Sequence, residues 1–300
     1  MAIVPAPALA LLLYAPALEG DAPVDPIVGG AETQPGDFDG VVAIQAGTGL
    51  CTGTVVAPRL ILTAAHCLAD LPDDERVIVH FGQTIEDGQV DAEDWGTHPQ
   101  FCADCREDIF DYAYVTLGTD FTVPDEYTTP IITQEEWDQA MTPGKEVTLV
   151  GYGDDPSVGG FQGGIGIKRE VQTTVVRISK GGLEFYAGGH QMDSCAGDSG
   201  GPAFVRVATG QLRLAGITSR GSNPCGDGGY YGAPYPALCW VRNETGVDLL
   251  GPACSNCDCI DTSPPDDGDK CSVQRRGTDA TAPWLLALVV LGRRLRRARR

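Results

Sequence analysis

The sequence predicts an all-β fold in one or two compact domains, because its apolar stretches are short and its turn-forming residues are numerous. Its 300 residues include 39 glycines and 21 prolines, which interrupt helices and mark turns. Apolar stretches of strand length occur at 40–45, 77–81, 147–150 and 212–218. A crossing at 118–130 that is rich in proline and threonine is expected to separate two strand-rich halves.

The negative charge of the chain is concentrated in one region. The formal net charge is −20; residues 27–253 hold 32 acidic residues against 12 basic ones, whereas the rest of the chain holds 9 of each. Binding to a phosphate backbone requires clustered positive charge, so we expect no nucleic-acid partner.

The N-terminal residues are typical of a secretory signal. Residues 1–18 are rich in Ala and Leu and end in Ala15-Pro16-Ala17, a small-residue pattern that a signal peptidase could cut. We therefore expect a signal peptide at 1–18 and a short acidic propeptide at 19–26. A misplaced start codon or an ordinary disordered terminus would also fit, because no Lys or Arg precedes Arg59. Eleven cysteines without zinc-like spacing indicate disulfides and an oxidising compartment, with at least one cysteine left over.

The C-terminal residues differ in kind from the body. Residues 251–270 are acidic and rich in cysteine, which indicates a disulfide-pinned linker that stays outside the core. In the tail, 271–300, Cys271 precedes an apolar run at 284–291 and an arginine cluster, and the run is too short to span a bilayer. This order resembles the C-terminal sorting tails of myxobacterial surface proteins. The resemblance implies removal of the tail and anchoring near Cys271, while a plain membrane anchor and a basic tail that anchors nothing stay open.

Four segments carry the residues on which a chemical function would depend. A serine hydroxyl is a weak nucleophile near neutral pH, so its attack on an amide requires a base and a buried carboxylate that orients the base. Ser199, His66 and Asp111 supply these three groups. The segments are Ile27-Val28-Gly29-Gly30, Thr63-Ala64-Ala65-His66-Cys67, Asp111-Tyr112-Ala113-Tyr114-Val115 and Gly197-Asp198-Ser199-Gly200-Gly201-Pro202.

Taken in order, the four segments resemble those of the chymotrypsin/trypsin-like serine proteases over residues 27–250. The resemblance implies two six-stranded antiparallel β-barrels with the active site between them, and a short C-terminal helix that we expect at 240–250. It also implies a serine endopeptidase that needs no cofactor or metal and acts on protein or peptide substrates. His66 would be the general base and then the general acid, Asp111 would orient it, and Ser199 would be the nucleophile. The backbone N–H groups of Gly197 and Ser199 would form the oxyanion hole.

Each of these residues has an ordinary structural interpretation when it is taken alone. His66 could be a structural histidine and Asp111 a surface carboxylate, and Asp108 could replace Asp111 in the orienting role. We prefer Asp111 because it lies two residues before an alanine in a strand-like run. A non-catalytic binding protein on the same scaffold and an esterase-like hydrolase are the competing functions.

The resemblance implies two disulfides and one missing disulfide. Cys51 would pair with Cys67 beside the histidine, and Cys195 with Cys225 beside the specificity pocket. Tyr186 stands where many relatives have a further cysteine, so that bridge is expected to be absent. Cys102 and Cys105 are additional, and a metal site is their alternative interpretation.

The resemblance also identifies candidate residues for substrate binding. Asp193, six residues before Ser199, would lie at the floor of the specificity pocket and select Arg or Lys, while Gly221 and Gly229 would form its walls. Ser219 would be a partner of Asp111. Arg220 replaces the tryptophan that is usual in the family, and we expect it to favour acidic or polar residues upstream of the scissile bond.

The last implication of the resemblance concerns activation. In the family, cleavage before a segment like Ile27-Val28-Gly29-Gly30 frees an ammonium that pairs with the aspartate before the nucleophile, here Asp198. Pro26 precedes Ile27, and proline does not suit a pocket whose floor is Asp193. We therefore expect activation by a separate peptidase or by stepwise trimming of residues 19–26, while a domain that works without a free Ile27 stays open. We also expect the protein to be secreted and attached to the cell surface or outer membrane.

Overall fold

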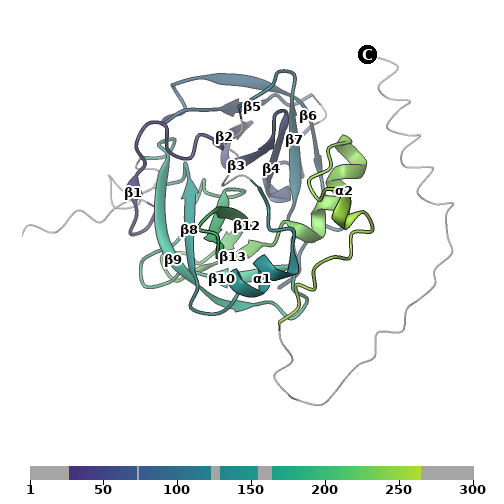
Figure 1. Cartoon of the computed structure of the whole chain (residues 1–300). Helices are drawn as coiled ribbons and strands as arrows, with labels where there is room; N and C mark the ends of the chain where they lie inside the picture. Colours follow the sequence, from purple (N-terminus) through teal and green to yellow (C-terminus); the bar gives the residue numbers. More distant parts are fainter. Residues whose placement is uncertain (1–26, 73, 123–128, 155–163, 265–300) are drawn as a thin grey trace, which may run out of the picture. The chain divides into compact units, whose positions relative to one another are not determined.

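The structure, a computed structural model, describes residues 27–72, 74–122, 129–154 and 164–264. Six antiparallel strands close into a first barrel in the order β2-β3-β4-β7-β6-β5 (Figure 1). These strands are β2 (Val41–Ala46), β3 (Gly49–Ala57), β4 (Leu60–Thr63), β5 (Val77–His80), β6 (Gln89–Thr97) and β7 (Ala113–Leu117). The first barrel therefore comes from the N-terminal half of the body, as the sequence predicts.

A second antiparallel barrel follows along the chain. Its strands run in the order β9-β10-β13-β12-β11-β8, and pairing between β8 and β9 closes the ring. The two-residue strand β1 (Ala31–Glu32) adds to β9. The ring strands are β8 (Glu146–Gly151), β9 (Arg169–Ile178), β10 (Glu184–Ala187), β11 (Pro202–Arg206), β12 (Leu212–Gly221) and β13 (Gly229–Gly232). The predicted fold of two six-stranded antiparallel barrels is thus confirmed.

The two barrels pack together because strands of the first bury both of their faces. Successive side chains of a strand point to opposite faces. In β2, Val42 and Ile44 lie in a core inside the first barrel, whereas Val41 and Ala43 belong to the larger core that contains the second barrel's Phe204. Continuous apolar packing therefore joins the two barrels.

The second half of the body also contains two short helices, of which the C-terminal one is confirmed as an element but begins earlier than the sequence predicts. Helix α1 (Gln134–Ala140) was missed, although Thr133 caps it by accepting a hydrogen bond from the Glu136 N–H, a common start signal. Helix α2 spans Tyr235–Thr245, so the expected range of 240–250 is wrong. Proline is compatible with the first turn of a helix, and Gly246, with a φ of 77°, ends it.

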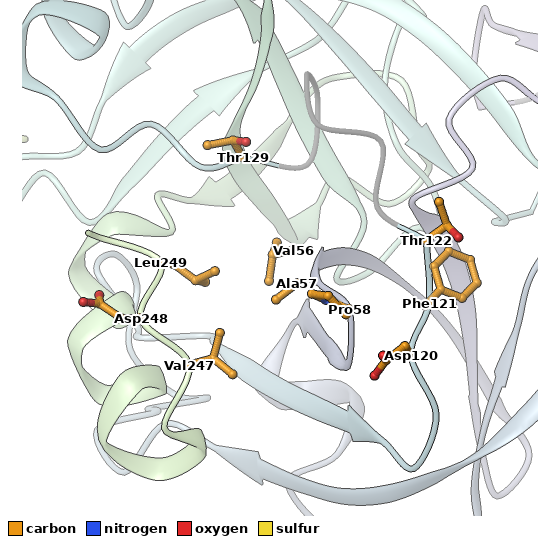
Figure 2. A pocket seen from close by; sticks show the side chains of 10 residues that line it. All are labelled: Val56, Ala57, Pro58, Asp120, Phe121, Thr122, Thr129, Val247, Asp248 and Leu249. Carbon is orange, nitrogen blue, oxygen red and sulfur yellow. The ribbon is translucent and has the colours of Figure 1, made fainter. Parts of the chain in front are cut away.

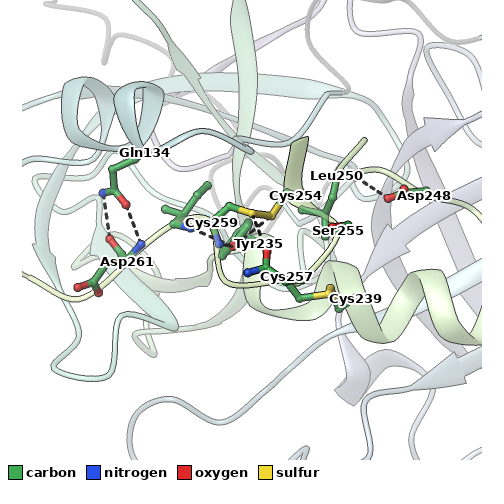
Figure 3. Close-up of a disulfide and its surroundings, with 12 residues drawn as sticks. Gln134, Tyr235, Cys239, Asp248, Leu250, Cys254, Ser255, Cys257, Cys259 and Asp261 are labelled. Atoms are coloured by element: carbon green, nitrogen blue, oxygen red, sulfur yellow. Dashed lines mark hydrogen bonds between the residues drawn. A yellow bond between two sulfur atoms is a disulfide. The ribbon is translucent and has the colours of Figure 1, made fainter. Parts of the chain in front are cut away.

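The cysteine-rich segment joins the core up to the last described residue, which corrects the expectation that it stays apart. Disulfides join Cys239 of α2 to Cys257, and Cys254 to Cys259 (Figure 3). The Tyr235 hydroxyl accepts hydrogen bonds from the N–H groups of Cys259 and Ile260. Cys254 and Ile260 are 2% and 6% exposed. The short 3₁₀ helix Pro252–Cys254 lies in this segment, and Cys271 lies outside the described residues.

Two basic residues are buried where β9 begins: Lys168 just before the strand and Arg169 as its first residue. Lys168 is 1% exposed, and its Nζ donates to the carbonyls of Asp37 and Phe38. Burial lowers the pKa of Lys168 to about 8, although nearby Asp39 and Asp37 oppose this shift. Arg169 is 2% exposed and donates to the carbonyls of Gly164 and Ile167. Among the described helices, none is long and apolar enough to cross a membrane.

Candidate active site

His66 and Asp111 meet at one edge of the first barrel. His66 lies in a 3₁₀ turn (Ala65–Cys67) just after β4, and Asp111 lies two residues before β7. The His66 Nδ1 is 2.7 Å from the Asp111 Oδ2, and the His66 backbone N–H donates to the Oδ1 at 2.9 Å. The Ser219 hydroxyl donates to the same Oδ2 at 2.6 Å. The carboxylate is 3% exposed, so its orientation is fixed by these groups.

The environment of Asp111 favours its ionised form. Burial alone would raise the pKa of Asp111, but hydrogen bonds from His66 and Ser219, together with the charge of His66, lower it. The competing residue Asp108 points elsewhere, because its carboxylate accepts from the Ser179 hydroxyl and the N–H groups of Gly181 and Leu183. Of the two candidates, Asp111 is the one that contacts His66.

Ser199 lies on a turn of the second barrel that is held by the first barrel. Thr52 of β3 donates its N–H to the Ser199 carbonyl at 2.7 Å and its hydroxyl to the Gly197 carbonyl at 2.9 Å. The Ser199 carbonyl is also 3.8 Å from the sulfur of Cys67, the neighbour of His66. These contacts bring the turn of Ser199 to the edge that carries His66 and Asp111.

The geometry of this turn requires glycine. Gly197 has a φ of 96°, which side chains disfavour, and a Cβ there would lie 2.8 Å from the Gly153 Cα. Within the described part of the chain, the N–H groups of Gly197 and Ser199 donate to no other protein group. Two free N–H groups beside a serine hydroxyl can bind an oxyanion.

Asp193 is fully buried beside the start of β13. Its Oδ1 accepts from the Ser194 N–H at 2.8 Å and from the Tyr231 hydroxyl at 3.3 Å, and its Oδ2 accepts from the Gly228 N–H at 2.8 Å. Burial raises the pKa of Asp193, and the backbone hydrogen bonds partly offset this. Among the described residues, its hydrogen-bond partners are N–H and hydroxyl groups, which carry dipoles and no net charge.

The two predicted wall glycines face each other across the sheet. Gly221 of β12 pairs with Gly229 of β13. A Cβ on Gly229 would lie 3.5 Å from the Gly221 Cα and 3.0 Å from the Arg220 carbonyl oxygen, so a side chain there would crowd the backbone of β12.

Arg220 is bound to an acidic residue of the protein itself. Its Nη1 and Nη2 donate to the two oxygens of Glu184, each at 2.8 Å, and its guanidinium stacks on the Tyr230 ring at 4.2 Å from the centroid. Glu184 begins β10 and is 2% exposed. The positive charge next to the pocket is therefore balanced within the fold.

Asp198 is buried, and no cation among the described residues forms a hydrogen bond with it. It is 2% exposed and accepts from the N–H groups of Gly153 and Cys195, both at 2.8 Å. Burial raises its pKa to about 7, despite these bonds and the charge of Arg169. Ile27 is 1% exposed, and the next residue, Val28, accepts the Asp193 N–H at 3.0 Å. The start of the body thus lies next to the backbone of Asp193.

Three disulfides lie close to these residues. Cys51 is joined to Cys67 and Cys195 to Cys225, which are the pairs that the resemblance implies, and Cys102 is joined to Cys105. The sulfurs of Cys102 and Cys105 are therefore not metal ligands. Cys51, Cys67 and His66 place three donor atoms within 4.8 Å of one another, but both sulfurs are consumed by their disulfide.

A surface pocket of about 580 Å³ lies away from this site (Figure 2). Its lining comes from the end of β3 and Pro58 after it, from residues 120–122 and Thr129, and from residues 247–249 after α2. None of these residues belongs to the group around His66 or to the pocket around Asp193. The chain between Thr122 and Thr129 lies outside the described residues, so the pocket is not a candidate site.

Three residues of the site were missed by sequence reasoning. Thr52 fixes the turn of Ser199, Tyr231 donates to Asp193, and Glu184 pairs with Arg220. No local pattern marks them, because each acts on a residue at least 36 positions away in the chain.

The comparisons with known proteins agree with this geometry. Residues 27–237 match the family model described as Trypsin. The chain belongs to the trypsin family. It is 26% identical over 274 residues to melanization protease 1 of Drosophila melanogaster, covering 73% of this chain and 66% of that protein. It is 30% identical over 189 residues to CLIP domain-containing serine protease B10 of Anopheles gambiae, covering 52% and 50%. It is 29% identical over 250 residues to spermosin of Halocynthia roretzi, covering 71% and 60%.

The trypsin-family match covers most of the chain but only part of the relatives. The chain spans between half and two thirds of the length of these three proteins. What the whole relatives do is therefore carried to this chain only as a proposal.

The burial of Asp198 predicts a pH effect in the chain that is not cut before Ile27. A carboxyl group whose folded-state pKa is raised from 3.8 to about 7 keeps a proton that the unfolded chain has already released. Its contribution to stability is therefore present at low pH and lost as the pH rises from about 4 to about 7. Relative to Asp198→Asn, the wild-type free energy of unfolding should fall by on the order of 4 kcal/mol over this range, because each pKa unit between 3.8 and about 7 corresponds to about 1.4 kcal/mol. Urea denaturation at several pH values measures this difference, and parallel pH profiles would contradict it.

Proposed function

We propose that this chain is a serine endopeptidase that hydrolyses peptide bonds through an acyl-enzyme intermediate. Ser199 attacks the carbonyl carbon of the substrate while His66 takes its proton, and His66 then gives the proton to the leaving amine. Asp111 holds the ring so that the other nitrogen faces the serine. Water then attacks the acyl carbon while His66 takes its proton, and His66 returns that proton to the Ser199 oxygen as the acyl–oxygen bond breaks and the acid product leaves. The observation that carries this proposal is the buried Asp111 carboxylate bound to both the backbone and the ring of His66.

The N–H groups of Gly197 and Ser199 are assigned the role of stabilising the negative charge that develops on the substrate oxygen. Preorganised donors of this kind stabilise the tetrahedral state without reorganisation. The carbonyls of both residues are held by Thr52 of the first barrel, so relative movement of the two barrels would disturb the oxyanion hole.

The proposed substrate preference is Arg or Lys before the scissile bond. Asp193 is fully buried, and within the described ranges its charge is met by N–H and hydroxyl groups rather than by a cation. A substrate cation would supply that missing charge. Because Glu184 balances Arg220, we propose no preference for acidic residues upstream, in contrast to the expectation from the sequence.

Two variants test both the chemistry and the preference. Ser199→Ala should fold normally but lose turnover by several orders of magnitude and lose labelling by a fluorophosphonate probe. Asp193→Ser should keep probe labelling but lose activity on Arg substrates by about a hundredfold or more relative to Phe or Ala substrates. Matched Arg, Lys, Phe and Ala peptides and esters provide the assay.

The outcomes separate the competing functions. A wild-type chain that the probe does not label would be a binding protein on this fold. Labelling with turnover of esters but no peptides would identify an esterase-like hydrolase. A wild-type preference for Phe over Arg would refute the role given to Asp193.

We propose that activation requires cleavage between Pro26 and Ile27 by a separate peptidase. The freed Ile27 ammonium would pair with Asp198, whose raised pKa shows how costly its buried charge is without a cation. Ordering of Asp198 would order the neighbouring N–H groups of the turn. Neither Pro26 nor Asp25 suits a pocket with Asp193 at its base, so the enzyme should not cut this bond itself.

Activation is tested on purified precursor incubated alone and with the host secretome. The precursor alone should stay inactive, and the secretome should produce activity together with a new N-terminus at Ile27, as seen by N-terminal sequencing. Self-activation with that N-terminus would refute the separate peptidase. Full activity of the uncut chain would show that a free Ile27 is not required.

The proposed processing also defines the domains and the location of the protein. We propose a signal peptide at 1–18, a propeptide at 19–26, a protease domain at 27–250, a cysteine-rich segment at 251–270 and a sorting tail at 271–300. Five disulfides among the described residues are typical of an oxidising compartment. Removal of residues 284–300 should release the enzyme from the cell surface into the medium with unchanged specific activity. Unchanged fractionation would contradict surface sorting.

A further inference from the structure

Arg220 and Glu184 form a bidentate ion pair beside the candidate active site. The two hydrogen bonds are each 2.8 Å long, and the Glu184 side chain is 2% exposed against 28% for Arg220. Two parallel bonds from a planar guanidinium fix orientation as well as distance, which a single charge contact does not. The pair therefore has a defined geometry that it can impose on its neighbours.

The neighbours of this pair are backbone groups that lie just before Asp111. Glu184 accepts the N–H groups of Asp108 and Ile109, at 2.9 and 3.3 Å. The Arg220 Nη2 donates to the carbonyl of Arg106 at 2.8 Å. Three backbone groups within the five residues that precede Asp111 are thus held by the two side chains.

The same segment has a strained backbone that needs such support. Asp108 and Phe110 have φ values of 57° and 54°, in the left-handed region that residues with a side chain disfavour. The Tyr112 N–H donates to the Phe110 carbonyl at 2.8 Å, which makes a tight turn around Asp111 itself. Conformations of this kind persist only where surrounding contacts determine them. The direction of the Asp111 side chain therefore depends on what holds 106–110.

Arg220 also reaches Asp111 by a second route. Its Nη1 is 3.3 Å from the Ser219 hydroxyl oxygen, and that hydroxyl donates to the Asp111 Oδ2 at 2.6 Å. The donated proton of Ser219 points to the carboxylate, so the guanidinium occupies an acceptor position of the same oxygen. One side chain thus contacts both the segment before Asp111 and the hydroxyl that binds its carboxylate.

We propose that the Arg220–Glu184 pair is a positioning device for Asp111, which holds segment 106–110 and Ser219 so that the carboxylate faces His66. The proposal rests on the proposed function of His66 and Asp111. It assigns Arg220 a role in the rate of the chemical step rather than in recognition of upstream substrate residues. Arg220 and Glu184 are positioning residues, since neither is assigned a contact with the reacting atoms.

The test uses the full-length chain processed to Ile27 and a short ester substrate with Arg as its only residue. Arg220→Gln should lower kcat per titrated active site by about tenfold to a hundredfold, the effect of small misplacements of catalytic groups. KM should change by less than about threefold, because such a substrate does not extend along β12. Arg220→Lys should recover only part of kcat, since an ammonium cannot make both bonds to Glu184.

A spectroscopic readout reports the position of Asp111 without turnover. The proton between His66 Nδ1 and Asp111 gives a low-field NMR resonance that depends on this hydrogen bond. It should shift or broaden in Arg220→Gln. The matched control is Arg213→Gln, which removes another arginine of β12 that pairs with a glutamate, Glu136, at 3.0 Å. That variant should leave both kcat and the resonance unchanged.

A double variant guards against simple misfolding. Arg220→Gln alone leaves Glu184 buried and unpaired, which destabilises a fold strongly. Arg220→Gln with Glu184→Gln removes both charges and should fold, yet show the same loss of kcat and the same change in the resonance. Wild-type kcat and resonance in the folded double variant would overturn the proposal.

The remaining outcomes separate this proposal from the proposed function. Loss of activity on long peptides only, with normal kcat on the short ester, would identify Arg220 as a recognition residue and overturn positioning. A wild-type chain without turnover or probe labelling would refute the proposed function, while the resonance would still compare the position of Asp111 between variants.

Discussion

Burial of negative charge is the constraint on which the arrangement of the site depends. Asp111, Glu184, Asp193 and Asp198 are each at most 3% exposed. A buried carboxylate is costly unless donors or a cation meet it, so the surrounding fold has to present N–H and O–H groups to each. Each of the four accepts at least one backbone N–H. The donors are those of His66 to Asp111, Asp108 and Ile109 to Glu184, Ser194 and Gly228 to Asp193, and Gly153 and Cys195 to Asp198.

The four carboxylates differ in how their charge is met. Asp111 has a histidine that can carry a positive charge, and Glu184 has a guanidinium. Asp193 and Asp198 receive hydrogen bonds only from backbone N–H groups and a hydroxyl, among the residues that the structure describes. The proposed mechanism brings a cation to each of these two carboxylates. Asp193 would receive the Arg or Lys side chain of the substrate, and Asp198 would receive the ammonium of the new N-terminus. A single electrostatic need therefore links substrate preference to activation.

The sequence predicts the parts of the site that lie in local motifs and misses those that depend on tertiary contacts. His66, Asp111, Ser199 and Asp193 were identified because short segments of fixed composition surround them, and the two barrels followed from resemblance. Glu184 carries no such signal, since its role arises only when β10 is brought beside β12 and residues 106–110. The predicted range of helix α2 begins too late because Pro234 and Pro236 indicate a boundary before Trp240. Proline is in fact compatible with the first turn of a helix. The acidic composition of the cysteine-rich segment predicts that it stays outside the core. Hydrogen bonding to Tyr235 and two disulfides instead hold it against the core.

The placement of basic residues has a consequence for an enzyme that meets copies of itself. Under the proposed preference, self-digestion would require a Lys or Arg in an accessible segment. The connections 118–144, 152–167 and 247–263 contain neither residue. The first basic residues after the second of these, Lys168 and Arg169, are 1% and 2% exposed and bound to carbonyls. The scarcity of cations that makes the body acidic thus also removes cleavable bonds from these three connections.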